Sequence, residues 1–584
     1  MKKVMLAVLF LSAVSVYAQV AADIHDFFYA DLERWETLGL VKKLPHARPY
    51  PLQVIKPALE SVMEKGDPVQ RAIADAHYRR FFSRTATFGG KSEAALDVNS
   101  GNKQIGAALS YDLNYLASPL LSASASVDVW AINKLPDDEI LTAGDASAKD
   151  ILKDNAKIGP LWMLPSINTA MAVGTPDTYL STGLMRASWG PFYRNGVIAG
   201  PQALHTGQAN LLVDRDLWAF NFSLYSLSAT SVANVISDNT TTTLYPEKYL
   251  VVHSLEFRPF ERFSASLLES VVYGNRFDPA YLFPFTPFMI TQGLYGFGDS
   301  SWLGLMFSGR PVDGLKLDAV FYADDLSFND LVKLDFDTKL RFSAQAGASW
   351  APVRSGIVSH VSLDYTAVMP YTYTHRIGSD NETLAQINYQ NYTHAGASFG
   401  ASLEPNSDRL NLKITLRPLE DFDIDLVGMY IRHGNVNEGL AQKWVREYLI
   451  KKDVYLSDGS INNNSASDVG HAFFYSNPFM KQNTIRHRVQ TGFNALCRLP
   501  VLKTGGYMVF KLGYRFEIDI NPGVSKSIYT YAGNDYGVED ANKLNDADKA
   551  AVDAEAALQY ETWLKNAKGT EIRNCITAGF EYYF

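Results

Sequence analysis

The chain has 584 residues and a net charge of −9, with 20% charged residues. A negative chain repels an acidic polymer unless basic groups cluster locally, so we expect no nucleic-acid partner. Aromatic residues make up 12% of the chain, with 32 Tyr and 32 Phe, and these residue types favour β-strands. After the N-terminal segment no window approaches the ~18 uninterrupted apolar residues of a membrane helix, which leaves soluble export or a closed membrane β-barrel.

The N-terminus has the pattern of a secretory signal peptide. Lys2 and Lys3 precede the apolar run VMLAVLFLSAVSV, and a small-residue cleavage site ends at Ala18. This run is shorter than the ~20 residues that a transmembrane helix needs. No Cys follows the cleavage site, so we expect residues 1–18 to be a signal peptide without a lipid anchor.

Residues 19–83 are predicted to form a small helical module. Apolar residues recur at helical spacing in DIHDFFYADLERWETLGL, and Gly39 supplies a stop. A second helix is expected to end at Gly66, and Asp67-Pro68 is typical of an N-cap followed by the first residue of a third helix. We expect the apolar stripe to serve packing, and the module to plug or cap the periplasmic mouth of the following domain or to dock a partner there.

From Thr85 onward the apolar period changes from the ~3.6 residues of a helix to the ~2 residues of a strand. The segments IGAALSYDLNY and LSASASVDVWAI alternate in this way and are joined by the short turn LASPL, which predicts a hairpin with one apolar and one polar face. DLWAFNFSL and FKLGYRFEIDI repeat the pattern later in the chain. A water-soluble sandwich also alternates, but it keeps its apolar face inside.

Recurrence of this alternation behind an export signal favours an all-β fold, a transmembrane antiparallel up-and-down β-barrel over residues 84–584. Roughly 500 residues at ~28 per strand and connection give about 16 to 18 strands. Short turns should face the periplasm and long connections the outside. Two long connections, 435–483 and 521–568, contain helix formers and are predicted to be extracellular helical loops.

The last ten residues, CITAGFEYYF, read as the closing strand of the barrel. This strand must pair with the first strand to remove both sheet edges. The predicted lumen row is Thr577, Gly579, Glu581 and Tyr583. The predicted lipid-facing row is Ile576, Ala578, Phe580, Tyr582 and Phe584.

Short motifs are spaced through the middle of the chain: HSLEF, ESVVYG, YLFPF, GD and YADDL, with RASWGPFYRNG before them and NYQNYTHAGASFGASLEPNSDRLNL after them. Together they resemble the Wzi family of capsule-assembly outer-membrane barrels. The chain departs from the family at Ser254, where Arg is expected, and at Ser300-Ser301, where Asp-Asn is expected. The resemblance implies an 18-stranded barrel with N-terminal helices, located in the outer membrane. It also implies a lectin that holds surface polysaccharide, and no enzyme.

Four residues are the candidate ligand contacts: Glu269, Asp324, Arg486 and Arg488. Strict alternation places Glu269 with Leu267 and Val271, unless the strand has a bulge. A charge facing lipid at mid-depth is costly, up to about 2–4 kcal/mol for a basic residue and less for a carboxylate. We therefore expect Glu269 to face the lumen, beside an Arg or Lys.

Strand geometry bears on the other three candidates, Asp324, Arg486 and Arg488. Asp324 and Asp325 are adjacent and point to opposite faces of a strand, so they are poorly placed to act together as acid and base. Arg486 and Arg488 share one face. They can pair with lumen carboxylates or bind anionic sugar or lipopolysaccharide.

The rival function is a channel for small solutes. Inward-facing bulky residues such as Trp130, together with the helical module, are expected to occlude such a pore. Neither a His-Glu-x-x-His motif nor a phosphate-binding Gly loop is present, so we expect no enzyme, no cofactor and no metal site. We expect a monomer surrounded by outer-membrane lipid. Cys497 and Cys575 can pair or stay reduced.

Overall fold

The structure is a computed structural model. It describes residues 24–134, 157–200, 205–228, 247–294, 298–325, 341–374, 389–394, 397–450, 479–501, 506–531 and 541–584, with a few short pieces between them. The predicted signal peptide lies outside the described residues. Within these ranges, no helix is both long enough and apolar enough to cross a membrane.

Three helices precede the sheet: α2 Phe28–Leu38, α3 Leu52–Lys65 and α4 Pro68–Phe82. Gly39 ends α2 at φ 77°, a left-handed conformation that glycine adopts without steric cost. The Asp67 carboxylate caps α4 by accepting a hydrogen bond from the Gln70 amide at 2.9 Å. Both signals were predicted from the sequence and are confirmed. The helices share a buried core of Phe28, Leu32, Trp35, Leu59, Val62 and Ile73.

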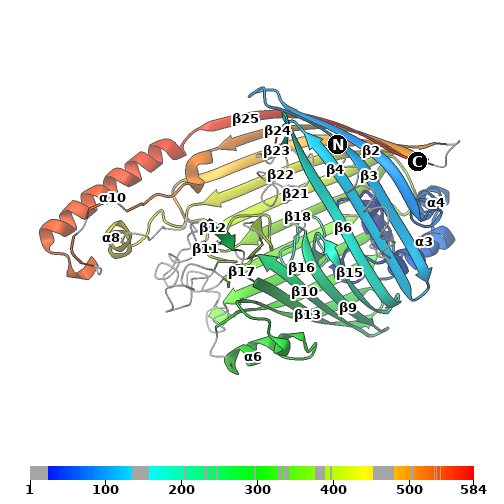
Figure 1. The fold of residues 1–584 in the computed structure, drawn as a ribbon, viewed down its shortest axis with the longest axis horizontal. Helices are drawn as coiled ribbons and strands as arrows, with labels where there is room; N and C mark the ends of the chain where they lie inside the picture. Colours follow the sequence, from blue (N-terminus) through cyan, green and yellow to red (C-terminus); the bar gives the residue numbers. More distant parts are fainter. Residues whose placement is uncertain are drawn as a thin grey trace.

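After these helices, the described residues form a closed barrel of 18 antiparallel strands, which confirms the predicted fold class (Figure 1). Its strands are β2 Ala86–Asp97, β3 Lys103–Ser118, β4 Leu121–Ile132, β6 Leu161–Thr175, β7 Thr178–Met185, β9 Thr206–Asp214, β10 Trp218–Ser228, β13 Glu247–Phe260, β14 Phe263–Gly274, β15 Ser300–Val312, β16 Leu315–Asp325, β17 Arg341–Trp350, β18 Val358–Val368, β21 Ser407–Leu419, β22 Phe422–Gly434, β23 Ile485–Val501, β24 Gly506–Ile520 and β25 Thr570–Tyr583.

Short strands lie in the connections. They are β1 Ala47–Arg48, β5 Lys157–Ile158, β8 Ser188–Trp189, β11 Ala233–Ser237, β12 Thr240–Leu244, β19 Thr393–His394 and β20 Ala397–Ser398.

The last strand closes the barrel against the first. β25 pairs antiparallel with β2 from Gly89 opposite Tyr583 to Asp97 opposite Cys575. The Phe584 amide continues the ladder by donating to the Phe88 carbonyl at 2.9 Å. Ile576 and Phe584 are exposed on the outside, whereas Tyr583 is buried in the lumen, as predicted. The closing strand therefore has both of its edges paired.

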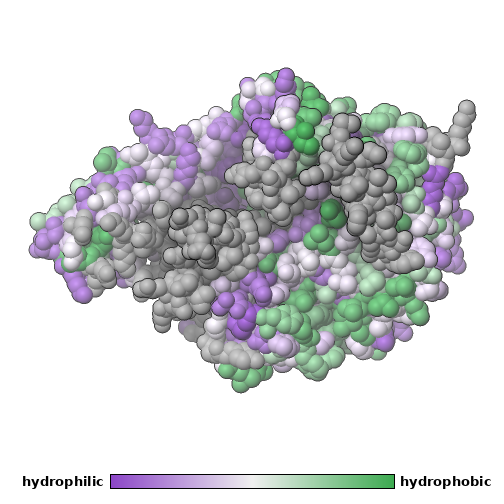
Figure 2. All heavy atoms as spheres, viewed as in Figure 1, coloured by the Kyte–Doolittle hydropathy of each residue, from purple (hydrophilic) through white to green (hydrophobic). Residues whose placement is uncertain are grey.

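Apolar residues cover the outside of the wall. On β3, Ile105 and Leu109 are exposed, with Leu109 at 77%, whereas Gln104 and Ser110 are buried and face inward. Figure 2 shows hydrophobic side chains gathered over the barrel strands. A water-soluble sandwich would bury this face, so the pattern is that of a barrel whose surrounding solvent is lipid.

The two ends of the barrel differ. Turns at one end are short, spanning 118–121, 175–178, 214–218, 260–263, 312–315 and 419–422. The long connections lie at the other end, where α8 Gln442–Ile450 and α10 Asp546–Ala567 project beyond the strands (Figure 1). Both helices were predicted, and an ion pair of 2.6 Å between Arg446 and Asp553 joins them. Part of the first predicted loop, 451–478, lies outside the described residues.

Candidate functional site in the charged lumen

The helical module lies in the barrel at the end with the short turns, away from α8 and α10 (Figure 1). Polar side chains of the module contact strands on several sides of the wall. These contacts join Gln53 to the Ala172 carbonyl (3.1 Å), Glu36 to Lys316 (2.9 Å) and Asp31 to Arg417 (2.6 Å). The module therefore fills this end of the lumen.

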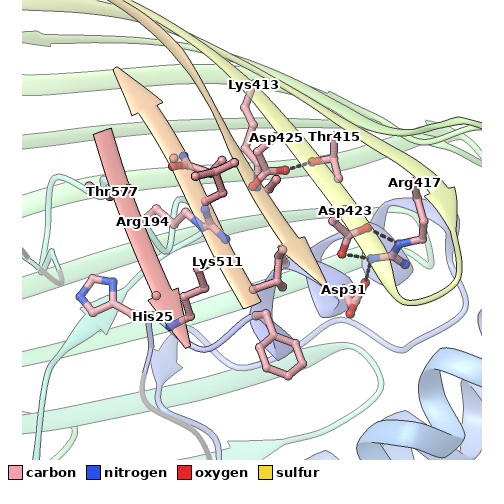
Figure 3. A pocket seen from close by; sticks show the side chains of 18 of the residues that line it. His25, Asp31, Arg194, Lys413, Thr415, Arg417, Asp423, Asp425, Lys511 and Thr577 are labelled. Carbon is pink, nitrogen blue, oxygen red and sulfur yellow. Dashed lines mark hydrogen bonds and ion pairs between the residues drawn. The ribbon is translucent and has the colours of Figure 1, made fainter. Parts of the chain in front are cut away.

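Asp31 of α2 is the centre of the strongest of these networks. Its buried carboxylate accepts from Arg417 at 2.6 Å, from His77 at 2.9 Å and from Arg498 at 3.4 Å. Burial acts to raise the pKa of Asp31, but the positive charge of Arg417 and the bond from His77 hold it well below its usual range. Arg417 also forms a bidentate pair with Asp423, at 2.5 and 2.9 Å. Figure 3 shows Arg417 between the two carboxylates.

A cavity of about 360 Å³ lies beside this network, between α2 and the barrel wall (Figure 3). Lys413 pairs with Asp425 there at 2.9 Å, and Thr415 donates to the same carboxylate at 2.6 Å. The size and polarity suit a small charged or polar solute. Its ionisable lining residues are His25, Asp31, Arg34, Glu93, Arg194, His360, Lys413, Arg417, Asp423, Asp425 and Lys511.

A second obstruction comes from residues 186–200, which fold inward. Here β8 pairs antiparallel with β1 of the helical module, so the loop and the module are joined by a small two-stranded sheet. The Asn195 amide donates to Asp364 of β18 at 2.7 Å. The loop thus reaches from the end of β7 to a strand on another side of the barrel.

An aromatic cluster holds this loop inside the lumen. The ring of Trp302 lies 4.7 Å from Tyr322, 5.2 Å from Tyr373 and 5.1 Å from Tyr392, and all four side chains are fully buried. The hydroxyl of Tyr373 donates to the Val197 carbonyl at 2.6 Å. Trp130 also points inward and is buried, as predicted. Packed side chains therefore fill the lumen at this level as well.

The structure brings together Arg486 and Arg488, and it places Asp324 elsewhere. Both arginines face inward on β23 and contact Asp519, with Nε–Oδ distances of 2.9 and 3.1 Å. The predicted pairing with lumen carboxylates is therefore confirmed. Asp324 also lies on an inner face, 3.9 Å from Arg341, but its strand β16 is separated from β23 by four strands.

The prediction that Glu269 faces the lumen is wrong. Glu269 lies on the outer face of β14, with Leu267, which is 52% exposed, and the register of β14 shows no bulge there. The connection after β14 folds back along the outside and places α6 Phe288–Leu294 over it. The carboxylate accepts from the Phe288 amide at 2.9 Å and contacts His253 at 3.3 Å. These partners, in place of an Arg or Lys, compensate the charge.

The covering segment itself exposes apolar side chains. Met289, Ile290 and Leu294 of α6 point away from the barrel and are exposed. The opposite side of the segment, at Tyr281 and Phe288, is buried against the wall. The segment therefore behaves as an outer layer between the strands and the surrounding lipid.

Sequence reasoning missed Asp31, Arg34, Arg194, Arg417 and Asp423. The signal for the wall residues was present, because polar and charged residues alternate with apolar ones in KITLR and again in DFDID. Nothing in the sequence indicates that Asp31 meets Arg417, since 386 positions separate them. Cys497 and Cys575 are not joined by a disulfide.

No family model and no curated protein sequence matches the chain. Among solved structures it is similar to Wzi of Escherichia coli, described as an outer-membrane protein involved in group 1 capsule assembly and a carbohydrate-binding β-barrel. The two are 12% identical with a TM-score of 0.51, over 97% of this chain and 99% of that one. Two further matches are Acinetobacter baumannii OccAB2 (8% identity, TM-score 0.39, 86% and 98% covered) and Pseudomonas aeruginosa OccD3 (10%, 0.36, 86% and 91%). The chain therefore has the fold of the Wzi outer-membrane barrel, as its sequence motifs predicted.

Proposed function

We propose that this protein binds or organises polysaccharide at the cell surface, and that its lumen is closed to bulk flow. One observation carries the proposal: the described lumen is filled at two levels, by the helical module and by the loop held under Trp302. A barrel with a filled lumen cannot conduct solutes freely, but it can present a binding surface at its outer end. The fold shared with Wzi, itself described as carbohydrate-binding, supports a glycan as the ligand.

We place the short turns and the helical module in the periplasm and the long connections outside, as is general for such barrels. In this orientation α8 and α10 form the outermost surface of a monomer that is otherwise surrounded by outer-membrane lipid. This surface carries the half-buried rings of Trp444 and Tyr560, and the Tyr560 hydroxyl donates to the carboxylate of Glu438 at 2.9 Å. Aromatic faces pack on sugar rings, and carboxylates accept hydrogen bonds from hydroxyls.

A glycan-array and whole-cell binding test on the refolded full chain examines this function. We expect binding to a surface polysaccharide, and we expect Trp444→Ala to weaken it by about threefold to tenfold. Trp350→Ala is the matched control, because Trp350 is exposed at the other end of the barrel. If the full chain binds no surface polysaccharide, the proposal is wrong.

A channel for small solutes is the second candidate, and the charged cavity beside α2 favours it. Lysine and arginine side chains along the wall would guide an anion if the helical module moved aside. Planar-bilayer recording separates the two functions. We expect no steady conductance from the full chain, whereas a stable open pore would establish the channel.

A further inference from the structure

We propose that the lumen cavity beside α2 is a binding site for a small oxyanion, a carboxylate, phosphate or sulfate group. The site is formed by Arg34 of α2, Ser359 and His360 of β18, and Arg417 of β21, all of which line the cavity. This inference does not depend on the glycan-binding surface proposed at α8 and α10. It concerns the end of the barrel with the short turns.

A cluster of buried polar groups without hydrogen-bond partners lines the cavity. Arg34, Ser359 and His360 are only 2%, 1% and 4% exposed. Within the described part of the chain, five polar atoms of these three residues and of Arg417 have no hydrogen-bond partner. These are Nε and Nη1 of Arg34, Oγ of Ser359, Nε2 of His360 and Nη1 of Arg417. Buried polar groups are almost always satisfied in folded proteins. Several unsatisfied donors around one cavity therefore point to an acceptor that binds in it.

Positive charge exceeds negative charge among the side chains around Arg34 and Arg194. Lys413 and Arg417 each have a carboxylate partner, Asp425 and Asp423 respectively. By contrast, no carboxylate lies within ion-pair distance of Arg34 or Arg194 among the described residues. Arg194 donates to the phenol oxygen of Tyr193 at 2.6 Å. Two cavity-lining guanidinium groups thus leave a surplus of positive charge.

Arg34 keeps its charge in this position. Burial, followed by the positive charge of Arg417, lowers the pKa of Arg34 to about 10, which leaves the guanidinium protonated at neutral pH. Burying such a charge without compensation is costly, and a bound anion would compensate it. The planar fork of a guanidinium also matches the two oxygens of a carboxylate or phosphate.

The acidic lining residue Glu93 belongs to another part of the cavity. Glu93 and Lys511 both lie opposite Gly579 of β25, one on each side of that strand. In Figure 3, Lys511 lies away from Arg417 and Asp31. The anion is therefore expected at the end formed by Arg34 and His360, where the carboxylates of Asp31 and Asp423 are already engaged by Arg417.

The cavity volume limits the ligand. About 360 Å³ accommodates an inorganic oxyanion or a single acidic sugar, and it is too small for a polymer. An inorganic oxyanion and an acidic sugar both present negatively charged oxygen atoms to Arg34. They differ in the neutral part of the molecule, which only the acidic sugar has.

The test is isothermal titration calorimetry on the detergent-solubilised full chain with phosphate, sulfate, glucuronate and, as a neutral comparison, glucose. We expect at least one oxyanion to bind with one-to-one stoichiometry, and glucose not to bind. Tighter binding of glucuronate than of phosphate and sulfate identifies an acidic sugar, and the reverse identifies an inorganic anion.

Variants connect the binding to the site. Arg34→Gln and His360→Gln should each weaken binding by roughly tenfold or more, and Arg34→Lys should weaken it less, since the charge remains. Arg79→Gln, at an exposed arginine of α4, should bind like the wild type. Heat-modified mobility on SDS gels confirms that each variant is folded. His360→Gln, on the barrel wall, keeps the test valid if Arg34→Gln loosens the helical module.

Two results would overturn the proposal. One is the absence of binding by any of the three oxyanions, which would mean that the cavity holds only water. The other is wild-type affinity in both the Arg34 and the His360 variants. Either result leaves glycan binding at α8 and α10 untouched, so the two proposals fail separately.

Discussion

Asp31 and Arg417 form an ion pair of 2.6 Å inside the barrel, although 386 positions separate them in the chain. The pair joins the helical module to the wall, and Arg498 on β23 reaches the same carboxylate. Removing one partner of a buried pair leaves the other charge uncompensated. This contact therefore decides how firmly the module closes the short-turn end.

We expect Asp31→Asn to lower the free energy of unfolding by about 3–5 kcal/mol, because Arg417 and Arg498 lose a shared anionic partner. Thermal unfolding in detergent measures the effect. Planar-bilayer recording of the same variant should show openings that the wild type lacks.

The control is Asp75→Asn on α4, where the pair of Asp75 with Arg79 is exposed and contributes only about 0–1 kcal/mol. Equal stability of the Asp31 and Asp75 variants would mean that the module is held by its other contacts, such as the pair of Glu36 with Lys316.

The stability of the docked module should fall in mild acid because of His77. Burial is the main cause that lowers the pKa of His77 below its usual value of 6.5, although the bond to Asp31 acts the other way. The unfolded state therefore binds the proton more readily. The contribution of neutral His77 is complete above about pH 6.5 and is lost as the pH falls below this value.

The contribution of Asp31 to stability also falls as the pH falls, but at a lower pH than that of His77. Its pKa is held below the usual 3.8, so its contribution is present above that value and is lost in stronger acid. Thermal unfolding between pH 5 and 8 tests the histidine part. The slope should be smaller in His77→Gln, and an unchanged slope would assign the acid sensitivity to other groups.

Glu269→Leu should release α6 from the outer wall. The substitution removes the acceptor of the Phe288 amide and of His253, and a buried donor without a partner costs about 1–3 kcal/mol. Limited proteolysis should then cut the segment that carries α6 faster, while the barrel keeps its folded mobility on SDS gels.

Glu261→Leu, in an exposed short turn, is the matched control and should leave the cleavage rate unchanged. Equal protection of α6 in the Glu269 variant would show that the apolar contacts of Tyr281 and Phe288 suffice to hold it.

Deletion of Phe584 should impair assembly of the barrel. The Phe584 amide donates to the Phe88 carbonyl, so the deletion shortens the ladder that seals β25 to β2. We expect a smaller fraction of heat-modifiable barrel in membranes. Phe584→Tyr keeps the backbone pairing and should assemble normally, whereas normal insertion of the deletion variant would contradict this role.

Much of the fold was predictable because strand alternation and turn signals are local. The hairpin around LASPL, the caps at Gly39 and Asp67 and the helix after Asn545 all follow from short stretches of sequence. The same alternation correctly placed Glu269 with Leu267. The cost of a charge facing lipid then led to the wrong face, because the covering α6 was not predicted.

The candidate site was much less predictable. Arg486 and Arg488 were identified through their shared face, but their partner Asp519 and the distant position of Asp324 required the order of strands around the barrel. Nothing in the sequence indicated that Arg34 is buried, since an arginine on a short helix is usually exposed. Its burial results from the insertion of α2 into the lumen.

The sequence by itself determined the two alternating rows of each strand and, Glu269 apart, which row faces outward. A lipid solvent cannot hydrogen-bond, so the apolar row must lie outside and the polar row inside. Only the tertiary structure decided which inward charges meet. Those contacts depend on the closure of the ladder between β2 and β25, and on two segments, α2 and residues 186–200, that enter the lumen. Charge pairing acts over a few ångströms, and residues far apart in the chain reach that distance only once the barrel has closed.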